Sequence, residues 1–524
     1  MKGRILTSLL AAVAIASLQA QTISSTPKLV VGITIDQFRT DYMEAFSALY
    51  GEKGFRRLLK EGCVYTNAGY PFKPVDRSSA VAALYSGTTP YYNGIIANQW
   101  LNRSNLRVTK STDDKEFMGM YTAENTSPRK LVVSTIADEL KVATQGKALV
   151  YAISPFRDAA VFGAGHAGDG AFWLNDDTGK WAGSTYYGTF PTWVIGYNDH
   201  QAIDSRIGSM TWETLQNKML YTYFSSEQTR GFKHSFTDYS KYRQFKTSGL
   251  VNEEVNRLVE RCLQGTTIGM DEIPDLLSIT YYAGNYEHKS TTEYPVEIQD
   301  TYVRLDQQLE RLIDMVDKKV GLRNTLFFIT STGYSDPEKS DLTPYRIPTG
   351  DFYMDRCTAL LNMYLMATYG QGKYVEAYHG LHIYFNHKLI EQKQLSLPDV
   401  LDKSAAFLVQ VSGVKAAYTA HELVLNANTP ERLLLHNGYN IQTSGDIVLE
   451  LNPGWKHMSE DPLVDSHYTS ESLINFPIIF FGHSVKPEIL PVPATVDCIA
   501  PTVTHFMRIR APNACRSTML GGVR

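Results

Sequence analysis

Long apolar runs alternate along this chain with segments in which apolar side chains recur every three or four residues. The first run spans residues 28–35, Lys-Leu-Val-Val-Gly-Ile-Thr-Ile, and is followed at once by Asp36. Runs rich in β-branched residues are typical of strands that are buried on both faces of a parallel sheet. Similar runs predict further core strands at residues 148–154, 275–282, 325–330 and 476–481.

Helices are predicted between these strands. The clearest has one apolar face whose members are spaced by four and three residues in turn: Ile298, Tyr302, Leu305, Leu309, Leu312 and Val316. Shorter helices are predicted at residues 54–61 and 132–140. Strands that alternate with helices indicate an α/β fold, with a mostly parallel central sheet that helices cover on both faces.

Two segments interrupt this alternation. Residues from about 155 to 245 are rich in Gly, Trp and Tyr, and residues from about 345 to 460 mix short strands with turns. We interpret both segments as insertions that form a cap beside the sheet. In open α/β sheets the ligand lies outside the carboxyl ends of the strands, so the residues that follow each strand are the candidates for a functional site.

Composition and charge exclude several classes of protein. The 524 residues include 50 Lys and Arg against 54 Asp and Glu, and 43% of the chain is hydrophobic, which is typical of a globular protein. The absence of a basic excess argues against a nucleic-acid partner. Residues 1–20 combine a basic start with a short apolar run and Ala20 as a cleavage residue, the pattern of a secretory signal rather than a membrane span. We therefore expect a periplasmic or secreted protein with no transmembrane segment, whose folded domain spans residues 27–524.

The five cysteines suggest neither a zinc ribbon nor a disulfide scaffold. Cys63, Cys262, Cys357, Cys498 and Cys515 are scattered and form no Cys-x-x-Cys motif. We expect Cys63 and Cys357 to be buried apolar residues. Cys498 and Cys515 are candidates for a disulfide in an oxidising compartment.

Eight short motifs occur in order along nearly the whole mature chain. They are Gly-Ile-Thr-Ile-Asp-Gln-Phe at 32–38, Tyr-Ser-Gly-Thr-Thr-Pro at 85–90, Asn-Gly-Ile-Ile-Ala-Asn-Gln-Trp at 93–100, Gly-Ala-Gly-His-Ala at 163–167, Thr-Gly-Lys-Trp at 178–181, Ser-Thr-Tyr-Tyr at 184–187, Gln-Asp-Thr-Tyr-Val-Arg-Leu-Asp at 299–306 and Ile-Ala-Pro-Thr at 499–502. Together they resemble the alkaline phosphatase superfamily, and within it the periplasmic phosphate-irrepressible phosphatases of Bacteroidetes. The resemblance predicts an alkaline-phosphatase-like α/β fold.

The resemblance also implies a chemistry. Members of the family hydrolyse phosphate esters with two zinc ions, which activate a Thr or Ser nucleophile and stabilise the leaving oxygen. Six Asp and His side chains supply the zinc ligands. In this sequence Asp36 and His467 stand at two of those positions, although His467 can instead be an ordinary hydrogen-bonded histidine. The other four positions are occupied by Tyr281, Asn285, Ser331 and Thr332. By this count most of the zinc site has been lost.

The nucleophile and the phosphate-binding positions have changed as well. The nucleophile position, ten residues before Gly87, is occupied by Arg77, and a guanidinium stays protonated and cannot attack phosphorus. The Lys and Arg that hold the substrate phosphate correspond to Phe156 and Asp158, with Arg157 between them. Asn98, which helps to bind a phosphate oxygen in the family, is retained.

Several of these residues have alternative interpretations. Asp36 can be a remnant zinc ligand, or it can cap the turn after its strand or pair with Arg77. Ser78 can replace the nucleophile by a one-residue shift, although the sequence indicates no base for it. Arg77 and Arg157 can bind an anion together if both face a cleft. Elsewhere, His379, His382 and His387 are either metal ligands or ordinary residues of a surface strand.

The sequence therefore predicts an exported, catalytically degenerate phosphatase-like protein that needs no cofactor. We expect it to bind an unknown protein partner or an anionic small ligand, or to serve in assembly. The alternative is an active, divergent metal-dependent hydrolase of phosphate or sulfate esters that uses Ser78 or a relocated zinc site.

Overall fold

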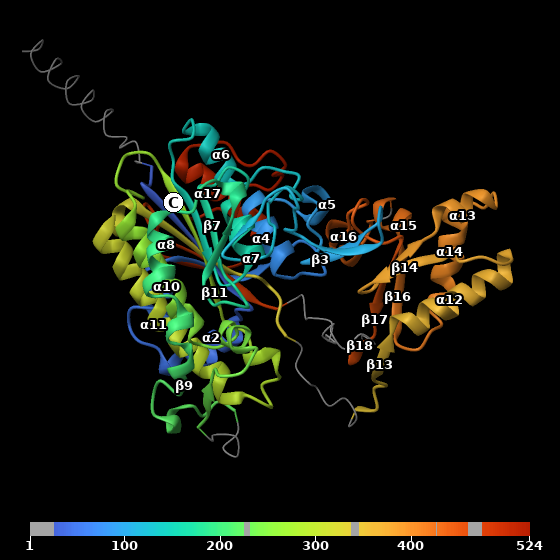
Figure 1. Ribbon diagram of the computed structural model, residues 1–524, viewed down its shortest axis with the longest axis horizontal. Helices are drawn as coiled ribbons and strands as arrows, with labels where there is room; N and C mark the ends of the chain where they lie inside the picture. Colours follow the sequence, from blue (N-terminus) through green and yellow to red (C-terminus); the bar gives the residue numbers. More distant parts are fainter. Residues whose placement is uncertain (1–25, 225–230, 337–344, 426, 459–473, 524) are drawn as a thin grey trace, which may run out of the picture.

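A ten-stranded mixed sheet forms the centre of the main body (Figure 1). The structure is a computed structural model, which describes residues 26–224, 231–336, 345–425, 427–458 and 474–523. From edge to edge the strands are β20 (Glu488–Thr495), β2 (Cys63–Gly69), β19 (Phe476–Gly482), β12 (Thr325–Ser331), β1 (Leu29–Asp36), β11 (Asp275–Tyr282), β6 (Val150–Ser154), β7 (Gly170–Leu174), β8 (Trp181–Ser184) and β5 (Gly119–Met120).

The predicted core strands are confirmed. β1 lies between β11 and β12 and runs parallel to both, and every residue of β1 and β11 is buried. β19 runs antiparallel between β12 and β2. An apolar run predicts burial but not direction, which is why the sequence did not separate this antiparallel strand from its parallel neighbours.

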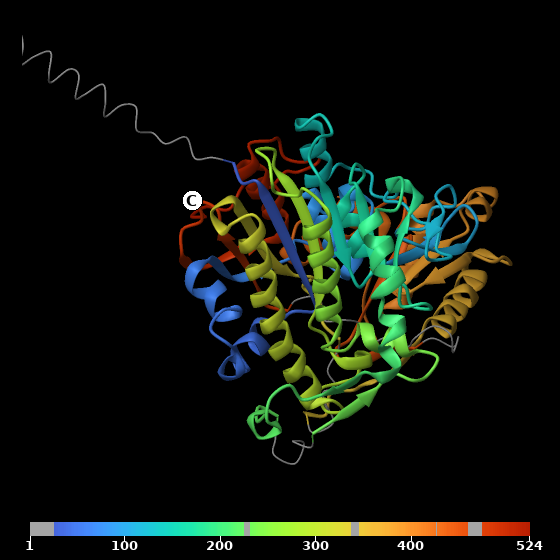
Figure 2. The same cartoon turned by 60° about the vertical axis from the view of Figure 1, so that its left-hand side comes forward.

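Helices cover the sheet on both faces. α10 (Val251–Gly265) and α11 (Pro295–Lys319) pack against each other on one face, where Figure 2 shows them side by side. The other face carries α4 (Arg77–Ser86), α6 (Ile136–Ala143), α7 (Arg157–Ala164) and α17 (Ile499–Met507). The helix predicted at 132–140 begins later, at Ile136, because the Thr135 side chain caps it by accepting the N–H of Asp138.

Shorter helices complete the main body: α2 (Thr40–Ala45), α3 (Phe55–Glu61), α5 (Pro90–Asn93), α8 (Thr192–His200) and α9 (Lys241–Lys246). Two strand pairs lie outside the large sheet, β3 (Gln99–Asn102) with β4 (Arg107–Lys110) and β9 (Thr211–Glu213) with β10 (Lys233–Ser235). Among the described residues, no helix combines the length and the apolar character that crossing a bilayer requires.

The segment from Gly350 to Met458 has a sheet and an apolar core of its own, and we call it the cap. It lies beside the main body at the right of Figure 1. Its antiparallel sheet has the order β14 (Val375–His379), β15 (His382–Phe385), β17 (Ile447–Leu451) and β16 (Val414–Thr419), next to a parallel pair, β13 (Gly350–Tyr353) and β18 (Trp455–Met458). Its helices are α12 (Met354–Tyr369), α13 (His387–Gln392), α14 (Leu397–Leu408), α15 (Ala420–Leu425) and α16 (Pro430–Gly438).

The interpretation of residues 155–245 as a cap insertion is wrong for the first part of that segment. α7, β7 and β8 belong to the main body, where β7 extends the central sheet next to β6. Trp173 and Trp181 anchor β7 and β8 and are almost completely buried. These strands are short and glycine-containing, so they lack the long β-branched run that marked the other core strands.

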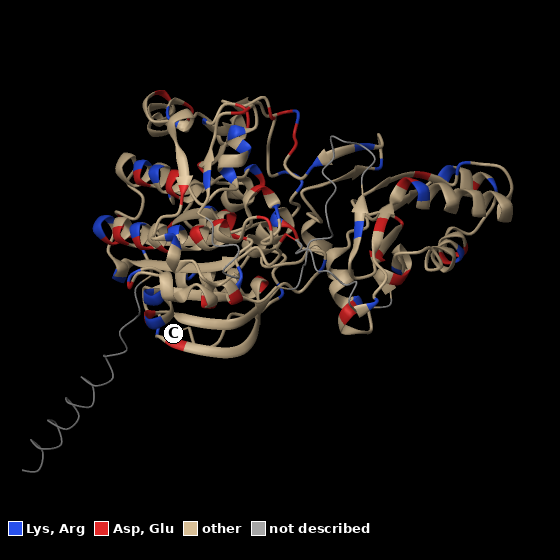
Figure 3. Ribbon diagram, turned by 90° about the horizontal axis from the view of Figure 1, so that it is seen from below, with Lys and Arg blue, Asp and Glu red and all other residues tan. Residues whose placement is uncertain are grey.

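The remaining general predictions concern charge and cysteines. In Figure 3 basic and acidic positions are interspersed over both the main body and the cap. All five cysteines are free thiols, so no disulfide joins Cys498 to Cys515. Cys63 and Cys357 are buried, as predicted.

Candidate functional site

The start of α4 places Arg77 opposite the end of β1. Asp76 caps this helix: its carboxylate accepts the N–H of Ser79 at 2.9 Å, and the Ser79 hydroxyl accepts the N–H of Asp76 at 3.0 Å. Arg77 is therefore the first residue of the helix, and the small residues that follow it are buried against α7. This reciprocal cap fixes the position from which the Arg77 side chain extends.

The Arg77 guanidinium lies between two buried carboxylates. Its Nη1 donates to Asp36 Oδ2 at 3.1 Å, and its Nε donates to Asp158 Oδ1 at 2.9 Å. The Asp36 side chain is completely buried and the Asp158 side chain is 4% exposed. The guanidinium also stacks over the Phe156 ring, 3.7 Å from its centre. We call Asp36, Arg77 and Asp158 the arginine triad.

The pKa values of the two carboxylates in the triad are shifted in opposite directions. Burial would raise the pKa of Asp158, but Arg77 and the Ser78 hydroxyl hold that pKa below its ordinary value. At Asp36 burial outweighs Arg77 and Thr332, and the pKa is raised. Burial lowers the pKa of Arg77, but Asp158 and Asp36 overcome this effect and raise it, so the guanidinium is a permanent cation.

Ser78 has a carboxylate partner that the sequence did not indicate. Its hydroxyl donates to Asp158 Oδ2 at 2.6 Å, and the Ser111 hydroxyl donates to Ser78 Oγ at 3.2 Å. Ser78 is nonetheless completely buried, and the pKa of Asp158 is lowered, which makes this carboxylate a weak base. In this geometry the hydroxyl is neither accessible to an ester nor activated.

Thr332 and Ser331, at two of the expected zinc-ligand positions, are engaged in hydrogen bonds within the protein. The Thr332 hydroxyl donates to Asp36 Oδ1 at 2.9 Å and accepts the N–H of Gln37 at 2.9 Å. The Ser331 hydroxyl donates to the carbonyl oxygen of Phe38 at 2.7 Å. Both oxygens of Asp36 are thus occupied, one by Thr332 and the other by Arg77.

The structure does not place Tyr281 beside the arginine triad. Tyr281 donates its hydroxyl proton to Asn256 on α10, whereas Tyr282 is the residue paired with Asp36 across the two strands. Because side chains alternate between the faces of a strand, Tyr282 extends on the side of Asp36, where its ring packs on Phe156. Asn285 lies in the following loop, and its carbonyl oxygen accepts the Tyr282 hydroxyl at 2.7 Å.

His288 is a site residue that sequence reasoning missed. It lies seven residues after Tyr281, whereas the family pattern places its histidine four residues after that position, at Asn285, so counting at a fixed spacing passes over it. Its Nδ1 lies 3.0 Å from Asp336 Oδ2, and it lines the same cleft as Arg77 and Asn98. Burial lowers the pKa of His288, but the Asp336 carboxylate more than compensates and raises it.

The cleft over the triad has a volume of about 610 Å³ and contains the predicted phosphate-binding residues. Asn98 lies on its wall and is exposed. Arg157 is also on the wall, but its Nη2 is paired with Asp113 at 2.9 Å and with Glu124 at 3.5 Å. An anion that bridged Arg77 and Arg157 would therefore have to displace carboxylates from both guanidinium groups.

The three histidines considered as a separate metal site are in the cap. His379 and His382 pair across β14 and β15, and His387 begins α13. Burial together with the neighbouring His379 lowers the pKa of His382 to about 4, and its Nδ1 accepts the N–H of Gly445. His387 is bound to Asp446.

The donor groups at the family's ligand positions do not fit two zinc ions. Asp36 is saturated by Arg77 and Thr332, two hydroxyls replace an Asp-His pair, and Tyr281 lies elsewhere. A fixed cation next to Asp36 also opposes a divalent ion electrostatically. Within the part of the chain that the structure describes, no group of three or more His, Cys, Asp or Glu side chains is arranged to hold a metal ion. His467 lies outside the described residues.

Comparison with known proteins identifies relatives over most of the chain. The model of the type I phosphodiesterase / nucleotide pyrophosphatase family matches residues 30–471. Alkaline phosphatase PafA of Elizabethkingia meningoseptica is 28% identical over 509 residues, which cover 93% of this chain and 92% of that protein. Alkaline phosphatase PhoV of Synechococcus elongatus is 28% identical over 514 residues, which cover 93% and 91% of the two chains.

A solved structure has the same fold. The crystal structure of wild-type alkaline phosphatase PafA matches this chain with a TM-score of 0.82 at 26% identity, over 95% of this chain and 99% of the other. These similarities confirm the resemblance to the alkaline phosphatase superfamily and the alkaline-phosphatase-like fold.

Proposed function

Because the chain belongs to the type I phosphodiesterase / nucleotide pyrophosphatase family, we propose that it is an exported, phosphatase-like member that no longer hydrolyses esters and acts by binding. The leader-like pattern of residues 1–20 supports the export, to the periplasm or the exterior. A fold does not by itself specify a reaction, so the activity must be argued from the site.

The observation that supports the loss of hydrolysis is the position of the Arg77 guanidinium. It stands at the nucleophile position and bonds both Asp36 and Asp158, at 3.1 and 2.9 Å. A buried cation between two carboxylates provides the charge balance that a divalent metal provides in a hydrolase. It offers neither a Lewis acid nor an activated hydroxyl.

The competing function is hydrolysis by Ser78, and the contact with Asp158 is the feature in its favour. This reaction would require Ser78 to become exposed and Asp158 to gain basicity. Both requirements oppose the geometry, since Ser78 is buried and Arg77 lowers the pKa of Asp158.

Turnover assays separate the two functions. The full mature chain, Ser78→Ala and Arg77→Thr are assayed with p-nitrophenyl phosphate, bis-p-nitrophenyl phosphate and p-nitrophenyl sulfate, each with and without added zinc. Arg107→Thr, on the exposed strand β4, is the matched control for loss of an arginine.

We expect all four proteins to give the rate of the protein-free blank. Arg77→Thr restores a hydroxyl but not the missing ligands at Ser331 and Thr332, so zinc is not expected to rescue it. A wild-type rate above the blank that Ser78→Ala abolishes would establish the hydrolase instead.

The binding role is tested by calorimetric titration with phosphate and sulfate. Heat with one site per chain would identify an anion as the ligand of the cleft. Without such heat, a protein partner is the remaining candidate, because Arg77 and Arg157 stay bound to their own carboxylates.

A further inference from the structure

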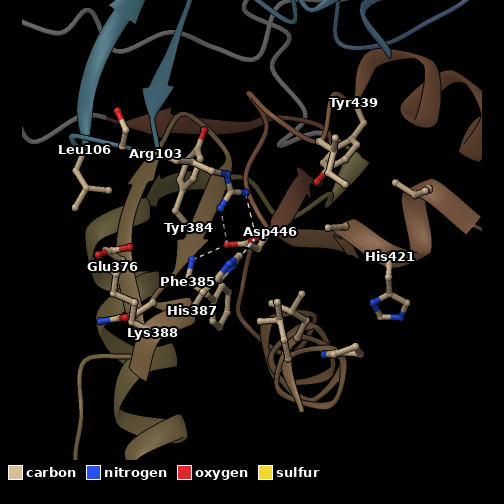
Figure 4. Close-up of a pocket in the computed structure, with 18 of the residues that line it drawn as sticks. Arg103, Leu106, Glu376, Tyr384, Phe385, His387, Lys388, His421, Tyr439 and Asp446 are labelled. Carbon is tan, nitrogen blue, oxygen red and sulfur yellow. Dashed lines mark hydrogen bonds and ion pairs between the residues drawn. The ribbon is translucent and has the colours of Figure 1, made fainter. Parts of the chain in front are cut away.

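A second cavity, of about 820 Å³, lies where the cap meets the turn between β3 and β4 (Figure 4). The turn contributes Arg103 and Leu106 from the main body. The cap contributes residues from β15, α13, α14 and α15 and from the segment before β17. The volume is in the range of pockets that hold small molecules, about 300–1,000 Å³.

Most of the cavity wall is apolar. The buried part consists of Tyr384, Phe385, Leu401 and Tyr439. Leu106, Leu425 and Ile441 also line the cavity and are 39%, 73% and 66% exposed. Apolar side chains that gather at a cavity and remain exposed are typical of ligand sites, because they lower their free energy when a ligand covers them.

One part of the wall is polar and is organised around Asp446. Its Oδ1 accepts from Arg103 Nη2 and lies within hydrogen-bonding distance of His387 Nε2, both at 3.0 Å. Its Oδ2 accepts from Arg103 Nη1 at 3.2 Å and from the N–H of Phe385 at 2.7 Å. The Asp446 side chain is only 6% exposed, so this carboxylate is saturated and is not a receptor for a cationic ligand.

Two of the accessible polar groups on this wall are basic, and they lie alongside the exposed Ser104 and Asn105 and the partly exposed Glu376. His387 is half exposed, and Lys388, the next residue, is exposed and lines the same cavity. Figure 4 shows the two side chains on one side of Asp446, with Arg103 reaching it from the opposite direction. The hydrogen bond with Asp446 raises the pKa of His387, although burial opposes this effect. Glu376 is the remaining carboxylate on the wall, so the wall carries one acidic side chain besides Asp446 and the two basic side chains of His387 and Lys388.

We propose that this cavity binds an amphipathic monocarboxylate, such as a fatty acid of medium chain length. The apolar body would lie against Leu106, Leu401 and Leu425, and the carboxylate would lie at His387 and Lys388. A carboxylate bound by charged donors gains more than a neutral head group would, because charge-assisted hydrogen bonds are about twice as strong as neutral ones. The site is separate from the arginine triad and does not depend on the function proposed above.

The ligand class is tested by calorimetric titration of the full mature chain with octanoate, 1-octanol and octylammonium. The three probes share one apolar chain and differ in the charge of the head group. We expect octanoate to bind at one site per chain, about tenfold more tightly than either other probe, as the loss of one charge-assisted hydrogen bond implies. No binding of octanoate, or equal affinity for all three probes, would overturn the proposal.

The location is tested with variants of the wall. His387→Gln and Lys388→Gln should each weaken octanoate binding about tenfold while leaving 1-octanol binding unchanged. Leu106→Ser should weaken both. The matched control, His200→Gln on the exposed end of α8, should change neither. Thermal unfolding verifies that each variant is folded. Lys388→Gln changes an exposed residue, so the test remains valid even if His387→Gln does not fold. Octanoate binding that all three wall variants leave unchanged would overturn the proposed site.

Discussion

Arg77 links the two buried carboxylates of the candidate site, Asp36 and Asp158. A guanidinium that bonds two buried carboxylates cannot be removed without leaving charge uncompensated in the interior. The Phe156 ring beneath it and the capped start of α4 leave it little freedom to withdraw. The residue to which the proposed function assigns the loss of hydrolysis is thus also the residue on which the local fold depends.

The first prediction concerns this dependence. Arg77→Leu should lower the free energy of unfolding by about 3 kcal/mol at neutral pH, since Asp36 and Asp158 would remain buried without a partner. Arg77→Lys keeps the positive charge but lacks the branched guanidinium that reaches both carboxylates. Its free energy of unfolding should therefore decrease by less than that of Arg77→Leu. Urea denaturation measures both, with Arg107→Leu on exposed β4 as the control. Equal stability of wild type and Arg77→Leu would contradict the claim that Arg77 stabilises the fold through the two carboxylates of the triad.

A pH dependence follows from Asp158. Its folded-state pKa lies below the ordinary value of 3.8, so ionised Asp158 stabilises the fold above about pH 3.8, and this contribution disappears as the pH falls through the folded-state pKa. The stability difference between wild type and Asp158→Asn should therefore be large at pH 7 and shrink below about pH 3.8. Denaturant unfolding from pH 3 to 7 measures it. A difference that stays constant over this range would show that Arg77 does not hold the carboxylate ionised.

At the site, the contacts of the candidate residues could be predicted from the sequence only in part. The pairing of Asp36 with Arg77 was one of the alternatives that the sequence left open, and the structure has this pair. Tyr281 was expected beside Asp36, whereas Tyr282 is the residue paired with Asp36, because a linear count does not show which face of β11 a residue occupies. The contact between Ser78 and Asp158 joins residues 80 positions apart, and no local pattern predicts it.

Among the elements, the turn between β3 and β4 connects the main body to the cap through few polar contacts. Arg103 on that turn bonds Asp446 in the cap, and Asp446 also bonds His387 at the start of α13. Lys73 and Glu450 form another ion pair between the two parts, at 3.3 Å. Ionisable groups thus contribute to the attachment of the cap, together with neutral hydrogen bonds such as that from Asn437 Nδ2 to the carbonyl oxygen of Pro71 at 2.7 Å.

A second pH dependence belongs to the bond between His387 and Asp446, which lies within the cap. The hydrogen bond with Asp446 raises the pKa of His387 above its ordinary value of 6.5, a direction that burial and Arg103 oppose and Glu376 supports. A raised pKa means that the stabilisation is fully present below pH 6.5 and is lost as the pH rises through the folded-state pKa. The unfolding midpoint of wild type should therefore exceed that of His387→Gln more at pH 5.5 than at pH 8.5. A larger excess at pH 8.5 would refute the assignment.

Prediction of the elements from sequence succeeded where one physical signal was strong. The long runs gave β1, β11 and β12, and the apolar stripe of α11 is buried along its length. It failed for β7 and β8, where a few large aromatic side chains provide the burial that β-branched runs provide elsewhere. Short strands of this kind can be recognised from the strands that they pair with in the sheet, and a single sequence does not reveal that pairing.

At the scale of the whole molecule, the main body and the cap have separate apolar cores. Leu305 on α11 and Leu361 on α12 are matched residues of these cores, and both are completely buried. Leu361→Ala should destabilise the cap by about 2–5 kcal/mol, the usual cost of a cavity of this kind. Hydrogen exchange should then accelerate in α12 and β17 while β1 and β11 keep their protection.

Leu305→Ala is the reciprocal control and should accelerate exchange in the central sheet. If Leu361→Ala instead accelerated exchange uniformly over both parts, the two cores would unfold as a single unit.

The central claim is that a guanidinium occupies the place of the catalytic metals in this member of the family. The most direct measurement is the zinc content of the native full chain, purified without chelators and analysed by elemental mass spectrometry, with an anomalous X-ray difference map at the zinc edge. The account predicts far less than one zinc per chain and no anomalous peak beside Asp36, where Arg77 forms its ion pair. Two zinc ions per chain with peaks at Asp36 would contradict it.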